Sequence, residues 1–171
     1  MRVLALASVF AFACGSATPA PPPPSNHGGT PGGGHEHLAS IERTACFGWC
    51  PIYKLTVYRD GVVEYDGDSY VKTKGKATGQ LTVEQLTAID ELFQKNGYMG
   101  FADTYTDASV TDMPSVHTSY SAGGKTKSIQ HYLGDQHAPE QLSTVEEGLD
   151  HIVQVERWIG TEDEREKMGR H

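Results

Sequence analysis

The strongest constraint on the fold is the segment Ile52–Tyr65, which reads IYKLTVYRDGVVEY. In its first half, apolar and polar residues alternate, so that Leu55 and Val57 share one face, as is typical of a strand that buries one side. The Asp-Gly pair that follows favours a tight turn, because glycine reaches positive φ without strain. The segment therefore predicts a β-hairpin, with Val57 opposite Val63 and Leu55 opposite Tyr65.

Similar patterns continue beyond this hairpin. A third strand is expected within Ser69–Gln80, and a second hairpin is expected from Val116–Ser121 and Lys127–Leu133, which flank a Gly-Gly pair. Between them, a capping box at Thr82–Gln85 opens a run of apolar residues at helical spacing, which predicts a first helix that ends at Asn96-Gly97.

A second helix is expected to start near Pro139 and to continue to Ile159. Strands interrupted by helices indicate an α+β domain. The sequence predicts an antiparallel sheet of about five strands, with two helices packed on one face, in the order βββαββα. This single globular domain is expected over residues 38–160, followed by a charged tail over residues 161–171.

The first 13 residues have the pattern of a secretory signal peptide. One cation, Arg2, precedes an apolar run that ends at Ala13 and is too short for a permanent membrane span. The stretch Ala11–Cys14 resembles a bacterial lipobox, in which the cysteine is lipidated; plain secretion with the same cleavage point is the alternative. The resemblance implies attachment to the membrane through lipid on Cys14, and Gly15 in place of an aspartate implies the outer membrane.

Residues 14–37 predict a tether. Six prolines and six glycines lie between Gly15 and Gly34, with almost nothing apolar, so this segment is expected to be a disordered linker. The chain as a whole carries a formal net charge of −8, which argues against nucleic acid and anionic lipid as partners. A protein or another envelope component remains open as a partner.

The stretch CFGWCPIYKLTVYRDGVVEYDG, which begins at Cys46, resembles the opening of an uncharacterised bacterial family, the domain of unknown function 6438. Tyr105, the Thr111–Pro114 segment, Ala138-Pro139 and the Asp150–Trp158 segment fit the same pattern. The resemblance covers most of residues 41–159. It implies exported or lipoprotein-borne domains that often follow a low-complexity linker, with no established activity.

The close pair Cys46 and Cys50 has three possible uses. Oxidising compartments favour a structural disulfide, which would fix the entry to the first hairpin. A Cys-x-x-x-Cys-Pro motif also looks like that of the thioredoxin-fold copper chaperones, and here His117 or His131 would have to complete a Cu(I) site. Thiol–disulfide exchange is the third use, although no helix is predicted after Pro51 to lower a thiol pKa.

Other polar residues have weaker patterns. Candidate metal ligands are His27, His35, Glu36 and His37 for zinc or nickel, and Asp103, Asp107 and Asp112 for calcium. Incidental linker residues and solvated loop acids are the competing interpretations. The sequence has no Gly-x-Ser-x-Gly motif and no phosphate-binding glycine loop.

The function predicted from the sequence is that of an exported, lipid-anchored domain that acts as a binding or structural module, without a cofactor. A copper-binding or thiol-redox protein that uses Cys46 and Cys50 is the alternative. A hydrolase is a more distant third.

Overall fold

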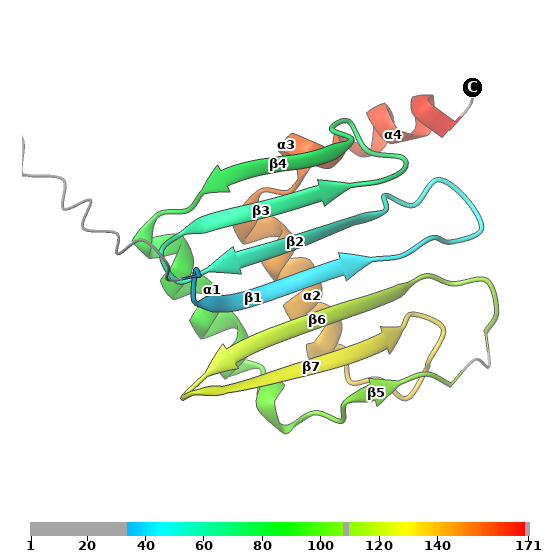
Figure 1. The fold of residues 1–171 in the computed structure, drawn as a ribbon. Helices are drawn as coiled ribbons and strands as arrows, with labels where there is room; N and C mark the ends of the chain where they lie inside the picture. Colours follow the sequence, from blue (N-terminus) through cyan, green and yellow to red (C-terminus); the bar gives the residue numbers. More distant parts are fainter. Residues whose placement is uncertain (1–33, 108–109, 170–171) are drawn as a thin grey trace, which may run out of the picture. The chain divides into compact units, whose positions relative to one another are not determined.

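The central strand of the sheet is β1 (His37–Arg43), which begins where the sequence predicted the end of a linker. In the computed structural model, which describes residues 34–107 and 110–169, β1 pairs antiparallel with β2 (Tyr53–Tyr58) on one side and with β6 (Ser115–Ala122) on the other. Strands from the two halves of the domain are therefore joined through β1 (Figure 1).

Four further strands complete a seven-stranded sheet of order β4-β3-β2-β1-β6-β7-β5: they are β3 (Val62–Gly67), β4 (Gly75–Gln80), β5 (Thr104–Tyr105) and β7 (Lys125–Tyr132). The predicted hairpins β2-β3 and β6-β7 are confirmed, including the pairing of Val57 with Val63 and of Leu55 with Tyr65. The prediction of about five antiparallel strands was wrong in detail, because β1 and β5 were not predicted and β5 pairs parallel to β7.

Strand β1 escaped prediction because its sequence does not alternate. The pairing of β1 with β2 shifts in register between His37 and Ala39, so the consecutive residues Leu38 and Ala39 are both buried. A two-residue period cannot represent such a pair. The strand sequence HLASIER also begins and ends with polar residues, which weakens the apolar pattern by which a strand is predicted.

The two predicted helices are α1 (Val83–Lys95) and α2 (Glu140–Val153). The capping box at the start of α1 is confirmed: the Thr82 hydroxyl accepts a hydrogen bond from the Gln85 N–H, and the Gln85 side chain accepts one from the Thr82 N–H. A short 3₁₀ turn, η1 (Tyr98–Gly100), follows α1.

The second helix ends earlier than predicted. Gln154 has φ 57°, which stops α2, and the chain continues as α3 (Glu156–Ile159) and α4 (Glu162–Gly169). The apolar residues that had extended the predicted helix, Trp158 and Ile159, belong to α3 and are still buried.

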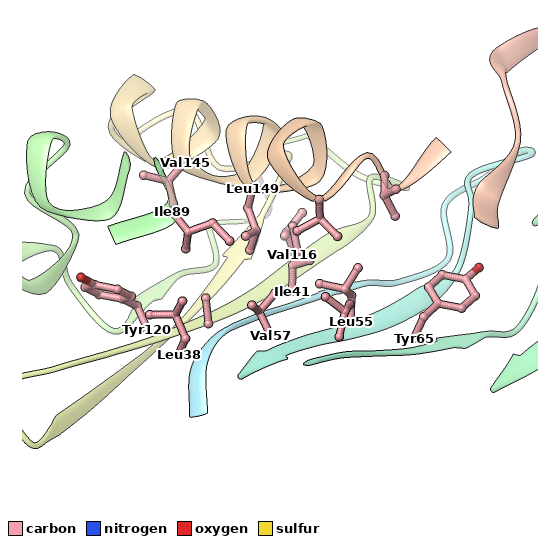
Figure 2. Packing of buried hydrophobic residues seen from close by; sticks show 14 of the residues in the cluster. Leu38, Ile41, Leu55, Val57, Tyr65, Ile89, Val116, Tyr120, Val145 and Leu149 are labelled. Atoms are coloured by element: carbon pink, nitrogen blue, oxygen red, sulfur yellow. The ribbon is translucent and has the colours of Figure 1, made fainter. Parts of the chain in front are cut away.

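The helices α1 and α2 cover one face of the sheet, and no described helix covers the other, which is called here the open face (Figure 1). Apolar side chains from the covered face and from these helices meet in one layer (Figure 2), which includes Leu38, Ile41, Leu55, Val57, Tyr65, Ile89, Val116, Tyr120, Val145 and Leu149. Burial of this layer is the main source of stability for such a domain.

The predicted signal peptide, Cys14, His27 and most of the predicted linker lie outside the described residues. Within the described residues, no helix combines the length and the apolar character that a membrane span requires.

Candidate functional site

The candidate site lies at the end of the sheet where β1 ends and β2 begins, called here the disulfide end (right side of Figure 1). The β1–β2 connection is hydrogen-bonded to both of its neighbours there. The Ile52 N–H donates to the Ser69 carbonyl at 2.9 Å, and the Phe47 N–H donates to the Asp112 carbonyl at 3.4 Å. Three connections that are distant in sequence therefore form one surface.

The two predicted cysteines are joined within this connection. Cys46 and Cys50 form a disulfide, with their Cα atoms 5.8 Å apart. The Gly48 N–H also donates to the Cys46 carbonyl at 2.9 Å, which tightens the turn. The disulfide closes a loop of residues 46–50, called here the aromatic loop, just before β2.

The aromatic loop exposes its two aromatic side chains. Phe47 is 91% exposed and Trp49 is 49% exposed. The Trp49 ring packs edge-on against Tyr70, with 5.3 Å between the centroids, and lies against Gly169 of α4. Phe47 therefore projects from the protein, whereas Trp49 is held by its neighbours on one side.

A second apolar segment lies next to the aromatic loop. Val110 and Met113 flank Asp112, whose carbonyl accepts the hydrogen bond from Phe47, and they are 39% and 41% exposed. The Tyr132 hydroxyl holds this segment by donating to the Val110 carbonyl at 2.9 Å and accepting from the Met113 N–H at 3.1 Å. The exposed apolar groups are thus carried by anchored backbone.

A charged network lies behind the aromatic loop. Arg43, at the end of β1, donates from Nε and Nη2 to Oδ2 of Asp150 in α2, at 2.9 Å and 2.7 Å. The Tyr53 hydroxyl donates to Oδ1 of the same carboxylate at 2.7 Å. The network connects the sheet to α2 across 107 residues of sequence.

Burial dominates the electrostatics of this network. It raises the pKa of the Asp150 carboxyl, although the Arg43 guanidinium and the Tyr53 hydroxyl act in the opposite direction. Burial and the Asp150 charge raise the pKa of Tyr53, so its hydroxyl keeps its proton. For Arg43, burial acts to lower the pKa, but the charges of and hydrogen bonds to Asp150 and Tyr53 together raise it, so the guanidinium is charged.

The proposed copper ligands do not converge. His117 is exposed on the open face of the sheet, whereas His131 lies on the covered face, where its Nδ1 is 2.9 Å from Oε1 of the buried Glu146. Because Cys46 and Cys50 are bonded to each other, this state offers no dithiolate to a metal.

The other candidate metal ligands are also separated. His35 pairs with Asp60, while both ring nitrogens of His37 bond serine hydroxyls of β6. Asp103 pairs with Lys127, and Oδ2 of Asp107 lies 3.4 Å from Nδ1 of His137. Within residues 34–107 and 110–169, no three or more His, Cys, Asp or Glu side chains are placed to hold a metal ion.

These features define a class of protein: an α+β domain in which helices cover one face of a sheet and a disulfide-closed loop joins two of its inner strands. The chain belongs to the family of the domain of unknown function DUF6438, whose sequence profile matches residues 37–153. The matched region runs from the start of β1 to the end of α2, so it contains the aromatic loop and the whole charged network. No curated protein shows significant similarity to the chain.

Sequence reasoning missed Arg43, Tyr53 and Asp150 as a group. One signal was available for this helix: Glu146 falls in the apolar stripe between Leu142 and Leu149, and a buried carboxylate requires a partner. For Asp150 itself, which sits beside that stripe, the partner is far away in sequence and could not be identified without the fold.

Removal of the disulfide is expected to lower the free energy of unfolding by about 2 kcal/mol, because the short covalent loop no longer restricts the unfolded chain. The test is urea denaturation of the Cys46→Ala/Cys50→Ala variant against a protein that carries only Cys14→Ser. In that control, no thiol should react before reduction, and the Cys46 and Cys50 thiols should react after it. Two reactive thiols in the unreduced control, or tight Cu(I) binding by it, would contradict the structural role.

Replacement of Asp150 by Asn is expected to change the pH dependence of stability. Because the folded-state pKa is raised, the folded protein binds this proton more tightly than the unfolded chain does. This carboxyl therefore favours folding at acidic pH, and its contribution is lost as the pH rises through the raised pKa. Urea denaturation from about pH 4 to about pH 7 should show the wild type losing stability relative to Asp150→Asn.

A constant difference between the two proteins over this pH range would show that the Asp150 pKa is not raised. The Asp150→Ala variant tests the whole network. Its free energy of unfolding should be about 3 kcal/mol lower than that of the wild type, because the substitution leaves the Arg43 charge without its partner in a partly buried site.

Proposed function

We propose that this chain is an exported, lipid-anchored protein whose domain binds a protein partner in the cell envelope through the aromatic loop. The observation that carries the proposal is the 91% exposure of Phe47 on a loop closed by a disulfide. An apolar ring in this position contributes nothing to the core, and the covalent closure limits the entropy lost when the loop is fixed in a complex.

Export and anchoring are supported by the N-terminal sequence. A short apolar run ends at Ala13, and Cys14 follows at once in a stretch similar to a lipobox. The disulfide between Cys46 and Cys50 is consistent with this location, because such bonds persist in oxidising compartments.

The type of partner follows from composition and geometry. Aromatic residues and Met are enriched at protein interfaces, and the surface formed by the aromatic loop with Val110 and Met113 has that composition. The net charge of −8 disfavours nucleic acid and anionic lipid. A protein partner therefore fits this surface better than either.

The direction of the chain also supports this choice. Strand β1 begins at His37 and has seven residues, so it is about 20 Å long. The aromatic loop follows the other end of this strand, after Arg43. Within the domain, the aromatic loop is thus at the end remote from the side on which a tether would arrive.

Anchoring is tested by replacing Cys14 with Ser. Acylation requires the cysteine thiol, so the variant should move from the membrane fraction to the soluble periplasmic fraction and should lose incorporation of labelled palmitate. Unchanged membrane association of Cys14→Ser would contradict a lipid anchor on this residue.

Binding is tested by placing a photo-crosslinking amino acid at position 47 and, as a matched control, at position 83. Val83 is 74% exposed but lies on α1, away from the disulfide end. We expect position 47, and not position 83, to crosslink one discrete envelope protein in cells.

With that partner purified, Phe47→Ser should weaken the complex by about 30-fold, the effect of a hot-spot residue. Because Phe47 is almost fully exposed, this substitution should leave the stability of the domain unchanged. Equal affinity of the wild type and Phe47→Ser would overturn the proposed binding surface.

A further inference from the structure

A hollow of about 300 Å³ lies behind the aromatic loop, between the sheet, α2 and α4. Its volume is at the lower end of the range of small-molecule sites. Pro51, Leu133 and Ile159 contribute apolar walls, and Cys50 of the disulfide is part of its lining. The charged groups that line it are Arg43, Asp150 and Arg165.

The charges in this hollow do not balance. Two guanidinium groups face one carboxylate, and both oxygens of Asp150 already accept hydrogen bonds, from Tyr53 at Oδ1 and from Arg43 at Oδ2. The lining residues therefore carry a net charge of one positive unit. A hollow whose lining has this net charge favours an anion as its ligand.

Donors also remain available. Arg165 donates from Nη1 to the Gly160 carbonyl, and its side chain makes no other hydrogen bond within residues 34–107 and 110–169. The Nη1 group of Arg43 likewise makes none there, since its bonds to Asp150 and Tyr53 use Nε and Nη2. Two of the residues that line the hollow thus keep unused N–H donors.

We propose that this hollow binds a small monocarboxylate with an apolar body. The unused donors of Arg165 and Arg43 would hold the carboxylate, and Pro51, Leu133 and Ile159 would contact the apolar part. This site is separate from the exposed face of the aromatic loop, so the inference does not depend on the proposed protein partner.

Both charge and shape favour one carboxylate over other ligands. A phosphate group carries about two negative charges near pH 7, more than the single surplus charge of the lining. A guanidinium matches a carboxylate through two parallel hydrogen bonds. A neutral apolar molecule would contact the apolar walls. It would also exclude water from the arginine N–H donors and leave them without hydrogen-bond partners.

Two sources of such a ligand have the same chemistry: a medium-chain fatty acid and a short acylated amino acid. Octanoate and N-acetylleucine represent them. The experiment is isothermal titration of each probe into the exported full chain carrying Cys14→Ser, with octanol as the uncharged analogue of octanoate and inorganic phosphate as a competitor.

The decisive variant is Arg165→Gln, since Arg165 lies on the outer helix α4 and its loss should not prevent folding. The matched control is Lys167→Gln, which removes the same charge from the same helix at an exposed position that does not line the hollow. We expect at least one probe to bind the wild type and Lys167→Gln equally, and Arg165→Gln to bind it about tenfold more weakly or worse.

Octanol should bind more weakly than octanoate, and Phe47→Ser should leave binding of the probe unchanged. The stronger of the two probes identifies the source. The inference is overturned if neither probe binds at millimolar concentration, if Arg165→Gln and Lys167→Gln weaken binding equally, or if inorganic phosphate displaces the probe.

Discussion

The pairing of β1 with both β2 and β6 is the interaction on which the rest of this structure depends. It joins into one sheet two hairpins that are separated in the chain by residues 68–114. It also places three features of the candidate site in succession: Arg43 ends the strand, the disulfide loop follows it, and β2 begins at Tyr53. Without this strand, neither the aromatic loop nor the charged network would have a fixed position.

The charged network then ties this end of the sheet to α2. Arg43 and Tyr53 come from neighbouring strands, at paired positions, and both bond the carboxylate of Asp150. Taking these groups out of water has a cost, as the raised pKa of Asp150 indicates. A purely apolar contact would give comparable stability, so this network is better explained by what it orients: a charged and hydrogen-bonding wall beside the hollow, next to the disulfide.

Much of this fold follows from local sequence signals, and the exceptions have a physical reason. The hairpins, the capping box of α1 and the start of α2 each depend on residues within a few positions of one another, and each was predicted. Strand β1 was missed because its register shift buries Leu38 and Ala39 together. The end of α2 at Gln154 was missed because a non-glycine residue takes a left-handed conformation there, for which the sequence gives no warning.

The candidate site likewise has a part that the sequence could predict and a part that it could not. Cys46 and Cys50 are close in sequence, and a disulfide between them was one of the three uses that the sequence predicted for the pair. Asp150 and Arg165 come from helices far along the chain, so their approach to Arg43 depends on the packing of α2 and α4 against the sheet. The disulfide contributes to both surfaces, because its loop carries Phe47 outward while Cys50 and Pro51 line the hollow behind it. The short loop that the disulfide closes therefore contributes both the exposed ring of Phe47 and part of the lining of the hollow.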